Sequence, residues 1–289
     1  MGIKVTSPTI EAVSVTCDAY PESLYDLDQP PDPLFTIGDL ALLVRPMVSI
    51  VGTREATSYG LRTARAIATA LAESGVVIVS GMARGIDAAA HRAAVECGGS
   101  TIAVLGTGVD VPYPVGHTEL HRLICNKGLV VSENGAGARA YKGAFPRRNR
   151  IIAALGKFTI VVEAGHQSGA INTANHVISL GKTLAAVLGP IDSAQSQGAN
   201  QLLRDGASVI AEVGDALILA GVTRVEQKQP LHLADAEARV WSAIGGETVR
   251  LDLIAQRSGL STRDCLTSVT ALELGGMIES LVTGEVRRR

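Results

Sequence analysis

Short apolar runs rich in β-branched residues alternate with helix-like segments between residues 46 and 222, and this alternation constrains the fold more than any other feature. The runs are Val48–Val51, Val76–Val79, Thr101–Leu105, Leu129–Val131, Phe158–Val162, Thr183–Leu188 and Ala207–Ile210. Between them, apolar residues recur at helical three- and four-residue steps. Strands without a polar face must be covered by helices on both sides. The pattern predicts an α/β fold with a doubly wound, mainly parallel sheet.

Composition along the chain indicates four regions. We expect residues 1–45 to form an extended N-terminal segment that packs on the core as a strap over one edge of the main sheet, because prolines punctuate it. Residues 46–222 would form the sheet domain. Residues 223–232 are polar and typical of a linker, and residues 233–289 would form a second domain.

The second domain has the pattern of a winged helix. Helices are expected over Ala234–Ile244, Leu251–Arg257 and Ser261–Leu274, with glycine in the turn between the last two. Two short strands, Met277–Leu281 and Thr283–Val286, would follow around a turn. Three helices followed by a hairpin predict a C-terminal winged-helix domain.

Composition also limits the class of protein. The net charge is −2, so binding of nucleic acid would require a local basic patch. The four cysteines are scattered, which is typical of reduced thiols in the cytosol. No apolar run reaches the roughly 18 residues of a membrane helix, and the first residues lack a secretion signal. We expect a cytoplasmic protein with no membrane association, no metal and no cofactor.

Glycine-rich turns follow the predicted strands, at the edge where open parallel sheets bind ligands. The turns are Gly52-Thr53-Arg54, which leads into a helix near Ser58, then Ser80–Asp87, Gly106–Asp110, Ser132-Glu133 and Glu163–Gly169. Glycine lets a ligand approach the backbone closely. A helix start offers unpaired amides and the positive end of its dipole. Several such turns at one edge predict phosphate binding.

Cations accompany these turns. Arg54 and Arg84 fall on this edge, and Lys142–Arg150 carries four cations around Phe145, just before a helix expected over Ile151–Leu155. Cations for phosphates beside an aromatic ring for base stacking are typical of single-stranded nucleic acid binding. An external anion would also offset positive charge near a helix N-terminus, unless nearby carboxylates neutralise it.

The turns and their spacing resemble the DNA-processing protein A (DprA/Smf) family from about residue 20 to the end of the chain. The matching motifs are Ile50–Arg54, Ser58–Gly60, Ser80–Asp87 with Ala90-His91, Ala103–Gly106 with Asp110, Tyr113 and Pro114, Ser132-Glu133, Phe145–Ile152, Val162–Ala164, Ser168-Gly169 and Thr173-Ala174. The resemblance implies a Rossmann-like domain that binds single-stranded DNA and forms a homodimer. It also implies that the protein protects incoming DNA and helps load the RecA recombinase during natural transformation and homologous recombination.

The turns and the resemblance together predict one set of DNA-binding residues. The set is Gly52, Thr53, Arg54, Ser58, Gly81, Arg84, Lys142, Phe145, Arg147, Arg148, Asn149, Arg150, Ser168 and Gly169. Phosphates would rest on the amides and cations of the Gly52–Ser58 and Gly81–Gly85 turns, and Phe145 would stack on a base.

Two other functions stay open. The same edge could bind and cleave a nucleotide, with Glu163 or Glu133 as general base, although the phosphate loop, the dinucleotide fingerprint and the nucleophile elbow are absent from the sequence. The winged helix could instead read duplex DNA while the sheet senses a ligand. The expected recognition helix Ser261–Leu274 has little positive charge, which favours protein contact. We therefore expect a binding protein without catalytic residues.

Overall fold

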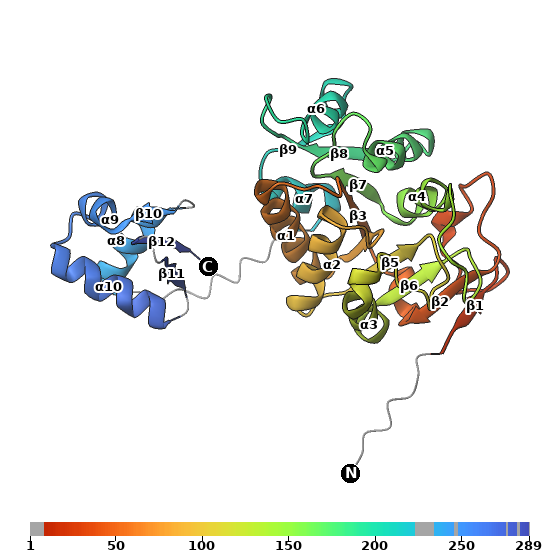
Figure 1. Ribbon diagram of the computed structural model, residues 1–289, viewed down its shortest axis with the longest axis horizontal. Coiled ribbons are helices and arrows are strands. Elements are labelled where there is room, and N and C mark those ends of the chain that lie inside the picture. Colours follow the sequence, from red (N-terminus) through yellow and green to blue (C-terminus); the bar gives the residue numbers. More distant parts are fainter. Residues whose placement is uncertain (1–8, 223–233, 246–247, 276, 282–283, 289) are drawn as a thin grey trace, which may run out of the picture. The chain divides into compact units, whose positions relative to one another are not determined.

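The computed structural model describes residues 9–222, 234–245, 248–275, 277–281 and 284–288 (Figure 1). The chain divides into two compact units, residues 1–225 and 226–289. The predicted linker, residues 223–232, lies outside the described residues.

The first unit contains one nine-stranded sheet with the order β1-β2-β6-β5-β4-β3-β7-β8-β9. Its strands are β1 (Glu11–Val13), β2 (Leu34–Gly38), β3 (Met47–Val51), β4 (Val77–Ser80), β5 (Thr101–Leu105), β6 (Leu129–Ser132), β7 (Phe158–Val161), β8 (Thr183–Val187) and β9 (Ser208–Ile210). Strands β3 to β9 correspond to the predicted apolar runs, and every pairing among them is parallel. The predicted fold class is confirmed.

Helices cover both faces of this sheet. They are α1 (Ser58–Glu73), α2 (Ile86–Glu96), α3 (Thr118–Lys127), α4 (Ala144–Leu155), α5 (Gly169–Ser179), α6 (Gln197–Arg204) and α7 (Val213–Ala220). Val48 and Ile50 of β3 belong to one buried cluster with α1, α2 and α7, whereas Met47 and Val51 belong to another with α4 and α5. Alternate residues of one strand therefore supply two apolar layers, which is why the run shows no polar face.

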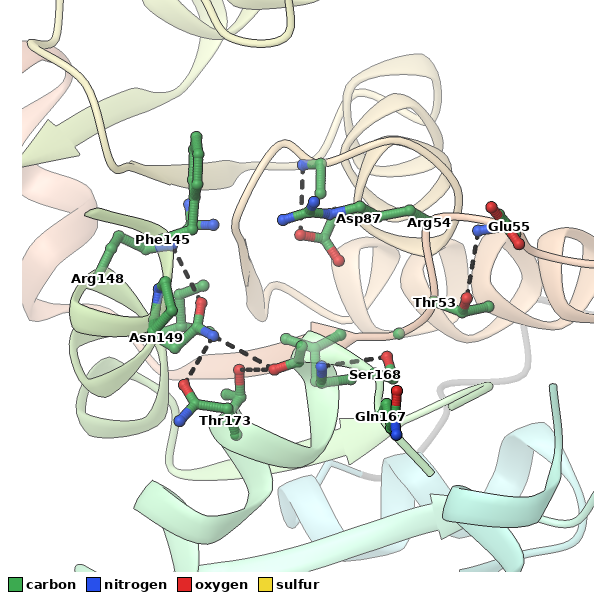
Figure 2. Close-up of a pocket in the computed structure, with 18 residues that line it drawn as sticks. Thr53, Arg54, Glu55, Asp87, Phe145, Arg148, Asn149, Gln167, Ser168 and Thr173 are labelled. Carbon is green, nitrogen blue, oxygen red and sulfur yellow. Dashed lines mark hydrogen bonds between the residues drawn. The ribbon is translucent and has the colours of Figure 1, made fainter. Parts of the chain in front are cut away.

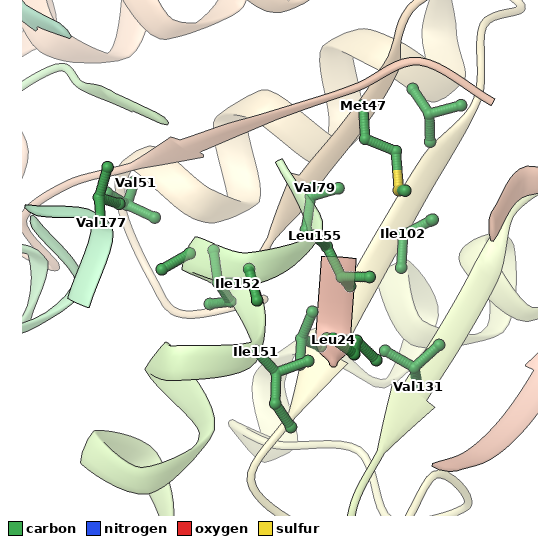
Figure 3. Packing of buried hydrophobic residues seen from close by; sticks show 14 of the residues in the cluster. Leu24, Met47, Val51, Val79, Ile102, Val131, Ile151, Ile152, Leu155 and Val177 are labelled. Carbon is green, nitrogen blue, oxygen red and sulfur yellow. The ribbon is translucent and has the colours of Figure 1, made fainter. Parts of the chain in front are cut away.

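The N-terminal segment is part of the sheet rather than only a strap over it. Strand β2 pairs antiparallel with β6, and β1 pairs antiparallel with β2. The short helical turn Glu22–Leu24 places Leu24 among Ile151, Leu155 and Val131 in the core (Figure 3). Two strands were therefore missed. Strand β1 has only three residues, and β2 follows several prolines, which is typical of a surface segment.

Helix α4 also differs from the prediction, since it begins at Ala144 and not at Ile151. Gly143, with φ at 96°, ends the preceding loop in a conformation that glycine favours. Pro146 is tolerated in the first turn, where its missing N–H has no partner within the helix. Arg147, Arg148 and Arg150 therefore lie within the helix, not in a loop before it.

The second unit forms a winged helix. It contains α8 (Asp235–Ile244), β10 (Val249–Arg250), α9 (Leu251–Ser258), α10 (Thr262–Leu274), β11 (Ile278–Ser280) and β12 (Glu285–Arg288). The three strands form an antiparallel sheet in the order β10-β12-β11, and Val240, Ile254 and Leu272 lie in the core beneath it. The predicted helices match; the two-residue strand β10 was missed.

Replacing Leu24 by alanine tests whether the N-terminal segment belongs to the core. Leu24 is fully buried, so we expect Leu24→Ala to lower the free energy of unfolding by about 2–5 kcal/mol. Val44 lies on the same segment but is exposed, and Val44→Ala should change it by less than about 0.5 kcal/mol. Urea denaturation of both variants measures the difference, and equal stability would contradict this role of the segment.

Candidate nucleic-acid interface

Two adjoining cavities lie at the carboxyl ends of the central strands. The larger, of about 320 Å³, is lined by the turns after β3 and β7 and by α4 and α5, and we call it the large chamber (Figure 2). The smaller, of about 250 Å³, is lined by the turn after β4 and by Tyr113-Pro114, and we call it the small chamber. Arg54, Phe145 and Arg148 line both chambers.

The position of the large chamber follows from the strand order. From β3 the chain moves outward through β4, β5 and β6, and then returns to the other side of β3 with β7. The order therefore reverses between β3 and β7. In open parallel sheets such a reversal leaves a crevice outside the carboxyl ends of the strands, which is where ligands bind.

The structure gathers most of the predicted DNA-binding residues at these chambers. The residues that line one or both are Gly52, Thr53, Arg54, Gly81, Arg84, Phe145, Arg148, Asn149, Ser168 and Gly169. The predicted residues that line neither are Ser58, Lys142, Arg147 and Arg150.

A buried carboxylate of the protein occupies the N-terminus of α1. The side chain of Glu163 accepts hydrogen bonds from the Thr57 amide at 2.9 Å and from the Thr57 hydroxyl at 2.5 Å. Thr57 in turn accepts a hydrogen bond from the Gly60 amide at 3.1 Å. The negative charge of Glu163 complements the helix dipole from inside the protein.

The turns after β3 and β4 are also satisfied internally. The Thr53 amide donates to the Glu163 carbonyl at 2.7 Å. The buried carboxylate of Asp87 accepts hydrogen bonds from the amides of Gly81 at 3.1 Å and Ala83 at 3.4 Å. Burial raises the pKa of Asp87. The expectation that phosphates rest on the amides of these two turns is therefore wrong for the amides named here, because they are already hydrogen-bonded.

The start of α5 has no such internal anion among its recorded contacts. Gln167, Ser168 and Gly169 line the large chamber, and Ser168 caps the helix by accepting a hydrogen bond from the Ala170 amide at 3.3 Å. Asn149 fixes this end of α5 to α4, because its side-chain amide donates to the Gly169 carbonyl at 3.3 Å (Figure 2). The first turn of α5 thus faces the large chamber, where its dipole favours an anion.

Arg148 is a buried structural cation. It donates to the carbonyls of Gly81, at 2.8 Å, and Val104, and so joins the ends of β4 and β5. Burial lowers its pKa to about 10, an effect that Asp87 opposes and Arg54 adds to. Its hydrogen bonds face the protein, not a ligand.

Glu133 forms ion pairs with the two other arginines of α4. Its carboxylate lies 3.0 Å from the guanidinium of Arg147 and 2.5 Å from that of Arg150. Arg150 also donates to the carbonyl of Gln29 at 2.7 Å, so it fastens the N-terminal segment to α4. The possibility that internal carboxylates neutralise part of the basic cluster is therefore realised for these two residues.

Three of the predicted cations keep an exposed charge. Arg54, Arg84 and Lys142 are exposed, and no ion pair is recorded for them within the described part of the chain. The Arg54 guanidinium lies 5.7 Å from the centre of the Phe145 ring, which is a cation–π distance. Glu55, also exposed, contributes one carboxylate to the rim of both chambers. The rim is therefore net positive.

Several lining residues were missed by the sequence analysis. Tyr113 lies with its ring centre 4.9 Å from that of Phe145, and Gln167, Asn172 and Thr173 line the large chamber. Tyr113 was part of a recognised motif, but its position beside Phe145 depends on how the loops after β5 and β6 meet. Across the described ranges, no cluster of three or more His, Cys, Asp or Glu could hold a metal ion, and no helix is long and apolar enough to cross a membrane.

Comparisons with known families match both units. The family model for DNA recombination-mediator protein A matches residues 11–220, and the model for the DprA winged helix domain matches residues 225–282. The chain is 41% identical over 239 residues to the putative DNA processing protein DprA of Mycobacterium tuberculosis, which covers 80% of this chain but 61% of that protein. It is 41% identical over 204 residues to DNA processing protein DprA of Streptococcus pneumoniae, covering 71% of this chain and 72% of that protein.

Solved structures agree with these matches. DNA processing protein A from Streptococcus pneumoniae superposes with a TM-score of 0.70 at 40% identity, over 72% of this chain and 74% of that one. DNA processing protein A from Helicobacter pylori, whose single-stranded DNA binding mode has been studied structurally, superposes with a TM-score of 0.66 at 30% identity. That match covers 74% of this chain and 97% of the other.

Two glycines in first helical turns test the role of Glu163. A Cβ on Gly60 would lie 2.1 Å from a carboxylate oxygen of Glu163, whereas a Cβ on Gly169 would meet nothing within 4 Å. We expect Gly60→Ala to lower the free energy of unfolding by about 1–3 kcal/mol through overpacking. Gly169→Ala should cause no loss. Chemical denaturation of both variants measures this, and a Gly60→Ala variant as stable as the wild type would contradict the packed carboxylate.

Proposed function

The chain belongs to the DNA-processing protein A (DprA/Smf) family, and on this premise we propose that it binds single-stranded DNA without sequence preference. In this proposal the protein protects incoming DNA and helps to load the RecA recombinase during natural transformation and homologous recombination. It acts as a binding protein and not as an enzyme. The free cysteines at positions 17, 97, 125 and 265 support a reducing, cytoplasmic location.

The observation that supports DNA binding is the net positive rim around two chambers that share an aromatic ring. Phosphates would contact the exposed cations Arg54 and Arg84 and the first turn of α5, and Phe145 would offer a surface for a base. Lys142 lines neither chamber and would add its charge from the loop before α4. Aromatic rings accept any base and cations accept any phosphate, so such a site tolerates sequence and depends on salt. The solved Helicobacter pylori relative, described as binding single-stranded DNA, supports the same ligand.

The remaining predicted residues would act indirectly. Arg148 and Asn149 hold the ends of β4, β5 and α5 in place beneath the chambers. Arg150 and Glu133 anchor α4 to the N-terminal segment. These contacts fix the backbone that carries Phe145, and a preorganised site loses less entropy on binding.

The far end of the sheet supports a homodimer. Strand β9 is the last of the nine strands, so one of its edges has no partner strand within the described residues. Val209 on β9 and Ile218 on α7 are exposed, as are Leu188 and Ile191 in the loop after β8. An unpaired edge with exposed apolar side chains is a surface that a second copy can cover.

The winged helix supports contact with a protein more than with duplex DNA. The exposed residues of α10 include Arg263, Asp264 and Glu273, together with the apolar Leu266 and Leu274. This surface lacks the excess of cations that binding to a DNA backbone requires. The alternative that the site cleaves a nucleotide has less support. Each candidate general base already has partners within the protein: Glu163 is hydrogen-bonded to Thr57, and Glu133 is ion-paired with two arginines.

Removing a single exposed cation tests the DNA site. We expect Arg54→Ala or Lys142→Ala to weaken binding of an oligothymidylate by about tenfold at low salt, because one phosphate contact is lost. The dependence of log K on log salt should become shallower by about 0.7. Fluorescence anisotropy at two or more salt concentrations measures both quantities.

Arg92→Ala is the matched control. Arg92 is exposed on α2, lines neither chamber and belongs neither to the turns after β3 and β4 nor to the loop before α4 that carries Lys142. Affinity and salt dependence should therefore stay at the wild-type values. If Arg54→Ala and Lys142→Ala behave like Arg92→Ala, the proposed site is wrong.

A charge on the apolar end of the sheet tests the dimer. Ile218 is 74% exposed and Val44, on the N-terminal segment, is 73% exposed. We expect Ile218→Glu to reduce the mass in solution from twice the chain mass of 30.0 kDa to once that mass. Val44→Glu should leave the dimer intact. Light scattering after size exclusion measures the mass, and an intact dimer in both variants would exclude this surface.

A further inference from the structure

Phe145 is contacted by two groups of different chemistry. The Arg54 guanidinium lies 5.7 Å from its ring centre, and the Tyr113 ring lies 4.9 Å from it at an interplanar angle of 33°. Because Arg54 and Phe145 line both chambers, this contact separates the large chamber from the small one. Tyr113 lines only the small chamber.

The loop that carries Tyr113 is held rigidly. The Thr107 hydroxyl donates to the Val111 carbonyl at 2.7 Å, and the Asp110 carboxylate accepts from the Gly137 amide at 2.8 Å. After Tyr113, a ring nitrogen of His117 lies 2.9 Å from the Met82 carbonyl. The loop that carries the ring is therefore tied to its surroundings on both sides of Tyr113.

Tyr113 is nevertheless 41% exposed, and no hydrogen bond to its hydroxyl is recorded within the described residues. The tyrosines at positions 20, 25 and 59 each donate to a backbone carbonyl. An aromatic ring that is carried by a tethered loop and left exposed in a cavity offers a large contact area to a ligand.

The walls of the small chamber suit a flat, apolar group with a charged neighbour. Tyr113, Pro114 and Phe145 provide apolar surface, and the exposed Arg84 and Arg54 provide positive charge. A nucleobase attached to a phosphate combines these two properties, and stacking between a base and an aromatic ring does not depend on sequence.

We propose that the small chamber holds a second nucleobase, next along the strand to the one at the large chamber, and that Tyr113 is the ring on which it stacks. The site then binds two consecutive nucleotides on either side of the contact between Arg54 and Phe145. Arg84 contacts the phosphate of the second nucleotide. This inference rests on the proposed binding of single-stranded DNA.

The test uses the full chain and an oligothymidylate, with binding followed by fluorescence anisotropy. We expect Tyr113→Ala to weaken binding by about 5- to 100-fold, the range for loss of one stacked base. Tyr113→Phe should stay within about twofold of wild type, because the ring is kept. Tyr141→Ala is the matched control, since Tyr141 is 47% exposed and lines neither chamber.

A second measurement shows whether Tyr113 stacks on a base itself or only supports the ring of Phe145. The chain has one tryptophan, Trp241, which lies in the second unit. In a Tyr113→Trp variant, the added indole should lose fluorescence on titration with oligothymidylate, beyond any change in the wild-type titration. Weaker binding by Tyr113→Ala without this quenching would show that Tyr113 only supports Phe145, and would overturn the inference.

The outcomes distinguish this inference from the proposed function. If the wild-type chain does not bind the oligonucleotide, the proposed function fails and the inference fails with it. If the wild type binds and Phe145→Ala weakens binding, but Tyr113→Ala binds like the wild type, only the second base site is overturned.

Discussion

The hydrogen bonds between Glu163 and Thr57 fix the turn on which the rest of the site depends. Glu163 follows β7 and Thr57 precedes α1, so the pair joins the two strands between which the sheet order reverses. An internal anion already complements the dipole of α1. The turn can therefore present Arg54 outward without requiring a ligand for its own stability. The helix starts therefore differ. Carboxylates of the protein accept hydrogen bonds from the turns before α1 and α2, whereas the start of α5 faces the large chamber.

The cations also differ in whether groups of the protein already contact them. A basic cluster in the sequence suggests one continuous binding surface, but the structure separates it by burial and pairing. Arg148 donates hydrogen bonds to buried backbone carbonyls, and Glu133 forms ion pairs with Arg150 and Arg147. The arginines of α4 thus position the helix. In the proposed function, the charge for a ligand comes from Arg54, Arg84 and Lys142. Arg54 and Arg84 come from different turns and line the small chamber together, so their convergence is a property of the fold and not of a single motif.

The sequence was sufficient for the parallel sheet, because runs such as Thr101–Leu105 are apolar on both faces and leave no alternative to a covered strand. It was insufficient for β2, where Leu34–Gly38 follows several prolines, and for the start of α4, where Pro146 hides the first turn. Most of the candidate residues line the two chambers at this sheet edge. Which amides and cations are free could not be predicted, because several of the contacts that satisfy them join residues far apart in the chain; Thr57 and Glu163 are 106 positions apart.

The reversal of strand order explains why the site has two chambers and not one groove. The large chamber lies between the connections that follow the paired strands β3 and β7, so its walls are the backbone turns and helix starts that such a reversal creates. The small chamber has a different origin, because it depends on the loop after β5, which Asp110 and His117 hold against neighbouring loops. The start of α5 belongs to the large chamber and Tyr113 with Arg84 to the small one, whereas Phe145 and Arg54 are shared by both. In a strand of DNA that crosses both chambers, the phosphates and the bases would contact separate parts of the protein. Such binding can be tight without any contact that reads the base sequence.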